Sequence, residues 1–144
     1  ERVGDYAANI AKRVMVLSQL PSVVGVGSIQ RMSRIVQEML KDTLDALGTN
    51  DAAKAHSVWQ RDEQVDEAYN AVFRSLLTYM MEDPRNITPC AHLLFVAKNI
   101  ERIGDHATNV AETIRFIVLG EEAEADRPKG DESAFAIVEP PAGP

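Results

Sequence analysis

Two stretches of twelve residues decide the fold: ERVGDYAANIAK at residues 1–12 and ERIGDHATNVAE at residues 101–112. They are identical at seven positions, and Val and Ile replace each other at two more. We call them the first and the second motif copy. Acidic and amide residues recur every four positions in both, which places them in one row along a helix. The rows are Glu1, Asp5 and Asn9 in the first copy and Glu101, Asp105 and Asn109 in the second.

Apolar residues at helical spacing predict four helices around these copies. We expect Ser28 and Thr88 to be the N-caps of the second and fourth helices, while Pro21 and Gly48 mark helix ends. Because short loops favour antiparallel neighbours, residues 21–119 predict an antiparallel three-helix bundle in an all-α fold. The predicted helices span residues 1–20, 28–48, 51–81 and 89–119.

Each of the last three helices has an apolar face that we expect in the core. The face of the second helix consists of Ile29, Met32, Ile35, Val36, Met39, Leu44 and Leu47. That of the third consists of Val58, Val65, Tyr69, Val72, Leu76 and Met80. That of the fourth consists of Leu93, Val96, Ile100, Ile103, Ala107, Val110, Ile114 and Ile117.

The first helix repeats the apolar spacing of the fourth exactly one hundred residues earlier. We therefore expect residues 1–20 to be the last helix of an incomplete first repeat, and the chain to be the C-terminal portion of a longer protein. The face that the missing helices would cover must find another partner. This favours a homo-oligomer.

Composition narrows the function classes. The net charge is −7 over 144 residues, and residues 119–144 account for −5 of it. The acidic, proline-containing tail at 120–144 is typical of disorder. The rest of the chain lacks the clustered basic excess of a nucleic-acid surface. The single cysteine rules out an internal disulfide and fits a reducing compartment, and no apolar run approaches the roughly 20 residues that span a bilayer.

The acids of the second motif copy lie far from the apolar face of their own helix. Periodicity alone therefore favours a solvated, salt-bridged surface. Acids four residues apart repel each other by a few tenths of a kcal/mol, roughly, unless a cation lies nearby. Lys98 and Arg102 are the candidates for that cation.

The third helix changes this interpretation, because Asp62, Asp66 and Asn70 have the same spacing there. Asp62 falls close to the apolar stripe, where a carboxylate is costly without a cation or hydrogen bonds. If the third and fourth helices pack antiparallel, these acids face those of the second copy. Hard cations with oxygen ligands would relieve the repulsion. No Cys and His set of a tetrahedral zinc site is expected.

Three segments carry a family resemblance: RDEQVDEAYNAVFRSLLTYMMEDPRNI at 61–87, AKNIERIGDHATNVAETIRFIV at 97–118, and ERVGDYAANIA at the start. They strongly resemble the PhoU family of bacterial phosphate-uptake regulators. The resemblance implies two related three-helix bundles and a cytoplasmic regulator that meets the membrane only through its partners. It implies coupling of a phosphate ABC transporter to a PhoR-type sensor histidine kinase, restraint of phosphate uptake, and repression of the phosphate-starvation response.

The resemblance also implies a metal site on the acidic motifs. By matching position, the ligands would be Asp62, Asp66, Glu101, Asp105, Glu1 and Asp5, with Asn9, Asn70 and Asn109 peripheral. The metal would be iron, manganese, magnesium or zinc, as a single ion or a cluster. For the first copy, the helix that would carry partner acids is not in this sequence.

Two other functions fit the same residues. One is a carboxylate-bridged di-metal enzyme, although the Glu-x-x-His pairs of ferritin-like centres are absent, since Gly104 stands three residues after Glu101. The other is a purely structural helical interaction module with ordinary surface acids. We expect a regulator without enzymatic activity.

Overall fold

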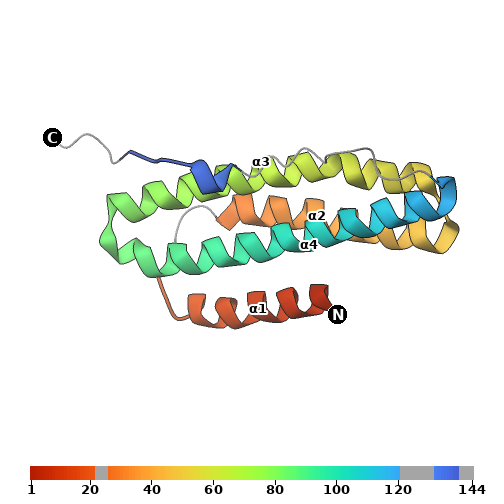
Figure 1. Cartoon of the computed structure of the whole chain (residues 1–144). Coiled ribbons are helices and arrows are strands. Elements are labelled where there is room, and N and C mark those ends of the chain that lie inside the picture. The colour runs from red at the N-terminus through yellow and green to blue at the C-terminus, as the bar shows by residue number, and fades with distance from the viewer. Residues whose placement is uncertain (22–25, 121–131, 140–144) are drawn as a thin grey trace.

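The computed structural model describes residues 1–21, 26–120 and 132–139, and these ranges form helices without a β-strand (Figure 1). The predicted all-α class is confirmed. No helix among the described residues has both the length and the apolar character needed to cross a bilayer. The elements are α1 (Arg2–Leu17), α2 (Val26–Thr49), α3 (Ala52–Glu82), the 3-10 turn η1 (Pro84–Asn86), α4 (Ile87–Leu119) and the 3-10 turn η2 (Ser133–Phe135).

Helices α2, α3 and α4 form the expected three-helix bundle, in which α3 runs antiparallel to the other two (Figure 1). Helix α4 is central, because it packs against α1 as well as against α2 and α3. The large side chains with almost no exposed surface come from all three bundle helices and include Met32, Met39, Val58, Val65, Leu76 and Ile114.

The helix ends follow local chemistry. The Asp51 carboxylate accepts a hydrogen bond from the Lys54 N–H and caps α3, close to where the sequence predicts that this helix begins. Gly120 ends α4 with φ of 70°, a left-handed conformation that glycine adopts without strain. The expected N-caps Ser28 and Thr88 are wrong: both lie inside a first turn, because α2 starts at Val26 and η1 leads directly into α4.

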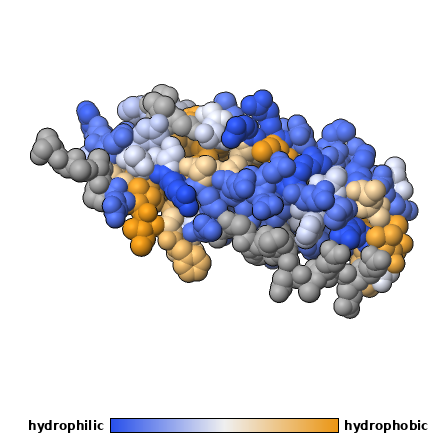
Figure 2. All heavy atoms as spheres, turned by 90° about the horizontal axis from the view of Figure 1, so that it is seen from above, coloured by the Kyte–Doolittle hydropathy of each residue, from blue (hydrophilic) through white to orange (hydrophobic). Residues whose placement is uncertain are grey.

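The apolar faces of α2 and α4 are confirmed except near their C-terminal ends. Leu44, Leu47 and Ile117 are at least half exposed, and Val110 is also exposed. Small residues take the inner positions there, and they let the helices approach closely: Ala46, Ala107 and Ala111 are buried, as is Thr43. Figure 2 shows a mainly hydrophilic surface with groups of apolar residues at both ends of the molecule, one of them where α2 meets α3 and α4 ends.

Helix α1 lies against α4, on the side away from α3, and runs antiparallel to it (Figure 1). It has no buried residue. Tyr6 stacks on His106 with ring centroids 5.7 Å apart, and Arg13 lies 3.9 Å from the centroid of the Phe95 ring. Tyr6 and His106 occupy the same position in the two motif copies, so the antiparallel contact pairs a position with its own equivalent.

The predicted boundaries at residues 20 and 120 remain predictions. Much of the tail that we expect to be disordered, residues 121–131 and 140–144, lies outside the described residues. Residues 132–139 contain η2, and Ala136, which follows it, has an extended backbone conformation. Glu132 forms an exposed ion pair of 3.7 Å with Arg74 of α3, while Phe135 and Ile137 are almost fully exposed.

Candidate functional site

The two predicted acids of α3 are buried. Asp62 is 3% exposed and Asp66 is 4% exposed. The position of Asp62 beside the apolar stripe is therefore confirmed. One oxygen of Asp62, Oδ1, accepts a hydrogen bond of 3.1 Å from the hydroxyl of Thr108, a fully buried residue of α4. Such a bond compensates part of the cost of removing a carboxylate from water.

Glu101 of α4 is also buried, at 6% exposure. The solvated surface that helical periodicity favours is thus wrong at this position. The cause is α3, which packs on that side of α4. The Lys98 ammonium lies 3.0 Å from Glu101 Oε1 and 4.7 Å from the centroid of the Tyr69 ring on α3. Of the two cations that the sequence offers, Lys98 is the one seen at Glu101.

The other candidate residues are less enclosed. Asp105 and Asn70 are half-buried, and Asn109 is exposed. In the first motif copy every residue of the row is exposed on α1: Glu1, Asp5 and Asn9. The structure therefore brings the buried acids of α3 and α4 to one helix interface and leaves the first-copy acids at the surface.

We call Asp62, Asp66, Glu101 and Asp105 the α3–α4 acids. Their residue types fit a hard cation, since carboxylate oxygens are its preferred ligands. Across the described ranges, no three His, Cys, Asp or Glu side chains gather into a group that could hold a metal ion in this arrangement. The predicted ligand set stays a prediction.

Two contacts at this interface were not predicted from the sequence: that of Thr108 with Asp62 and that of Tyr69 with Lys98. Thr108 belongs to no recognised functional motif. The first copy has Ala8 at the equivalent position, and this difference between the copies could have indicated a polar contact specific to the second copy. Tyr69 was expected only as a core residue. It is buried, and its ring also faces the Lys98 ammonium.

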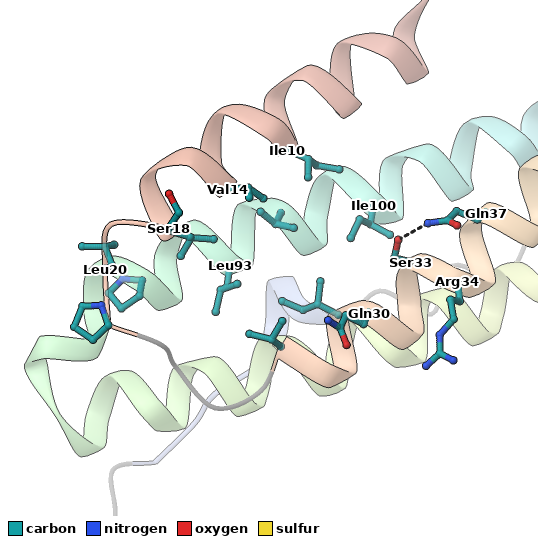
Figure 3. Close-up of a pocket in the computed structure, with 16 residues that line it drawn as sticks. Ile10, Val14, Ser18, Leu20, Gln30, Ser33, Arg34, Gln37, Leu93 and Ile100 are labelled. Atoms are coloured by element: carbon teal, nitrogen blue, oxygen red, sulfur yellow. Dashed lines mark hydrogen bonds between the residues drawn. The ribbon is translucent and has the colours of Figure 1, made fainter.

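A second feature is an apolar groove of about 820 Å³ between α1 and α2, with α4 as its floor (Figure 3). Ile10 and Val14 line it from α1, and Leu93 and Ile100 line it from α4. Most of its polar residues lie on α2, where Gln37 donates a hydrogen bond to Ser33. They are Gln30, Ser33, Arg34 and Gln37, and Ser18 after α1 is a fifth.

Two other titratable groups of the bundle, Asp42 and Cys90, have shifted pKa values that follow from contacts within the bundle. Arg61 of α3 donates to the Asp42 carboxylate of α2, and this bond lowers the pKa of Asp42 below its usual value. Burial raises the pKa of the Cys90 thiol. Cys90 is fully buried at the start of α4, as a small core residue.

The chain matches a known protein family and several of its members. Residues 29–114 match the model of the PhoU domain. The chain is 59% identical over 132 residues to a phosphate-specific transport system accessory protein PhoU homolog of Caulobacter vibrioides, covering 91% of this chain and 57% of that protein. A homolog of the same description from Rhizobium meliloti is 51% identical over 133 residues, with 91% and 56% covered.

Solved structures agree with the sequence relatives. The crystal structure of PhoU from Pseudomonas aeruginosa matches with a TM-score of 0.81 and 40% identity, over 84% of this chain and 58% of that one. The phosphate transport system regulatory protein PhoU from Streptococcus pneumoniae matches with a TM-score of 0.75 and 30% identity, over 85% and 58%. The chain thus spans a little over half the length of these relatives. It belongs to the PhoU family.

Proposed function

We propose that the protein regulates phosphate transport as an accessory protein of a phosphate-specific transport system. The observation that carries this proposal is the 59% identity, over 91% of the chain, to an accessory protein of that system. The proposed role is cytoplasmic and not enzymatic. The protein restrains the phosphate ABC transporter and couples it to a PhoR-type sensor histidine kinase, which keeps the starvation response off when phosphate is plentiful.

Within this role, the α3–α4 acids set the rigidity of the bundle. Buried carboxylates repel one another, and any group that compensates them holds α3 and α4 together. We propose that a divalent or trivalent metal, among iron, manganese, magnesium and zinc, binds these acids in one state of the protein. The chemistry that the metal supplies is charge compensation. The protein's own residues form the surface that transporter and kinase contact.

A matched pair of double variants tests the proposal. Asp62→Asn/Asp66→Asn removes two buried charges of α3, while Glu63→Gln/Glu67→Gln removes two exposed charges of the same helix at the same spacing. In cells that grow on high phosphate, we expect the buried pair to raise a starvation-responsive phosphatase reporter and phosphate uptake. The exposed pair is expected to leave both at the wild-type level.

Metal content of the same purified proteins completes the test. Plasma mass spectrometry after loading with each metal is expected to find bound metal in the wild type and in Glu63→Gln/Glu67→Gln, and less in Asp62→Asn/Asp66→Asn. Unchanged regulation in the buried double variant would remove the acids from the regulatory mechanism. Turnover of a phosphoester by the loaded protein would support the di-metal enzyme instead.

We also propose that the chain self-associates through the exposed face of α1. That helix has no buried residue, and its exposed positions outside the groove include Ala7, Ala11 and Met15. Static light scattering of the purified chain is expected to give a mass above that of one copy. A monomer at all concentrations would contradict this.

A further inference from the structure

Lys98 connects the two helices that carry the buried acids. Its ammonium is 3.0 Å from the carboxylate of Glu101, three residues further along α4, and 4.7 Å from the ring centroid of Tyr69 on α3. The first contact is an ion pair and the second is a cation–π interaction. One positive charge therefore contacts both sides of the α3–α4 interface.

The positive charge of Lys98 lies next to one buried carboxylate, and the facing helix carries two others. The Glu101 side chain is 7% exposed, and Asp62 and Asp66 are buried on the facing helix. Carboxylates in such surroundings require compensation by a cation or by hydrogen bonds. Thr108 supplies a hydrogen bond to Asp62, and Lys98 supplies a full positive charge to Glu101.

We infer that Lys98 is the built-in counter-cation of the α3–α4 acids and that it competes with divalent metal for Glu101. The second half of this inference rests on the metal binding proposed above. An ammonium that donates to Oε1 uses the oxygen a metal would need, and its charge repels a divalent ion at the same carboxylate. Metal therefore binds Glu101 more tightly once Lys98 leaves.

The Lys98 side chain can move from Glu101 into solvent. Its side chain is 30% exposed, so solvent already reaches it. A lysine side chain is long and flexible and keeps its ammonium well hydrated when it points into water. Two states follow: one in which Lys98 joins α4 to Tyr69, and one in which metal takes the carboxylate and Lys98 is solvated.

The test compares Lys98→Met, which removes the charge but keeps the length, with Lys98→Arg, which keeps the charge. Lys98→Gln is a second neutral variant that retains a donor for Glu101. Lys41→Met is the matched control, because Lys41 forms an exposed ion pair with Asp45 on α2. Mn²⁺ affinity is measured by titration, with free Mn²⁺ followed by its paramagnetic resonance signal. Urea unfolding in EDTA measures the metal-free state.

We expect the two neutral Lys98 variants to bind Mn²⁺ about tenfold or more tightly than the wild type, since a repelling charge is gone. Lys98→Arg and Lys41→Met are expected to match the wild type. In EDTA the neutral Lys98 variants should unfold at lower urea, and saturating Mn²⁺ should restore the midpoint. A lysine with a merely structural role would lower the midpoint without tightening Mn²⁺ binding.

The possible results separate the competition with metal, the counter-cation role of Lys98 and the proposed metal binding itself. Equal or weaker Mn²⁺ binding in both neutral Lys98 variants overturns the competition. A wild-type urea midpoint in EDTA for those variants overturns the counter-cation role. Absence of Mn²⁺ binding in every variant overturns the metal proposal together with the competition, while the unfolding measurement still decides whether Lys98 compensates the acids.

Discussion

The two motif copies have nearly the same sequence and very different surroundings. In α4, the face that includes Glu101, Gly104, Ala107 and Thr108 is buried against α2 and α3. In α1, all four equivalent positions are exposed. The burial of an acid is therefore a property of the neighbouring helices and not of the motif. A row of acids at four-residue spacing becomes a buried site only where another helix covers it.

The largest expected difference between the copies is in backbone protection. Amides of α1 should exchange with deuterium at least about 100-fold faster than those in the middle of α4, because α1 has no buried side chain and packs on a single helix. Peptides from Arg2–Leu17 and from the central part of α4 are compared by mass spectrometry. The comparison is made in dilute solution, where light scattering gives the mass of one copy, and equal protection of both helices there would contradict the exposure of α1. Protection of α1 that rises with protein concentration would support the self-association proposed above.

The two glycines give the next largest effect. A Cβ on Gly104 would lie 3.4 Å from Val36 Cγ2 and 3.5 Å from Val65 Cγ1, whereas nothing lies within 4 Å of a Cβ on Gly4. Gly104→Leu should lower the free energy of unfolding by about 1–3 kcal/mol through overpacking. Gly104→Ala fits without that loss. Gly4→Leu should leave the free energy unchanged or slightly higher, as urea unfolding would measure.

Thr108 in α4 and Ala8 in α1 occupy the same position of the two motif copies, and of the two only Thr108 donates a hydrogen bond to Asp62. Thr108→Val keeps the shape of the side chain but removes the hydroxyl that donates to Asp62. The expected loss of stability is about 1–2 kcal/mol, the cost of a lost donor to a buried acceptor. The reciprocal change Ala8→Thr, at an exposed position of α1, should have no measurable effect. Equal effects in both copies would contradict the assignment of Thr108 to Asp62.

The smallest expected effect concerns the ion pair between Arg61 of α3 and Asp42 of α2, which has no counterpart beside α1 among the described residues. Arg61 lowers the pKa of Asp42, so the pair stabilises the folded state above the unfolded pKa of about 4, and this contribution disappears as the pH falls through the lower folded value. The pair is partly exposed, and about 1 kcal/mol is expected at neutral pH. Urea unfolding at pH 7 and pH 3 should show a smaller acid loss in Asp42→Asn than in the wild type.

The sequence alone predicted the helices, the three-helix bundle and the position of Asp62 close to the apolar stripe, because apolar spacing reports which side of a helix faces the core. It was wrong about Glu101 for a physical reason. The hydrophobic pattern of α4 reflects its contact with several neighbours, and the polar sector between those contacts is covered by α3. The partner of Asp62 was not predicted either, because a threonine on a helix signals nothing until the facing acid is known.

Near the C-terminal ends of α2 and α4, the sequence predicted burial where the structure has exposed side chains. Leu44 and Ile117 continue the apolar spacing but are exposed, while the smaller residues Ala46 and Ala111 near them are buried. Helix starts also depended on structure: η1 merges into α4, so the Thr88–Pro89 sequence falls within the first turn.

The pairing of Tyr6 with His106 has a consequence for how the gene can change. When two identical chains meet antiparallel, the residue on the local two-fold axis faces its own copy and must suit itself. Joined in one polypeptide, the two positions can diverge. Here they have become a phenol and an imidazole, whose Oη and Nε2 lie 3.5 Å apart. Duplication inside one chain thus turns a symmetric contact into an asymmetric one, in which each side is inherited and selected separately.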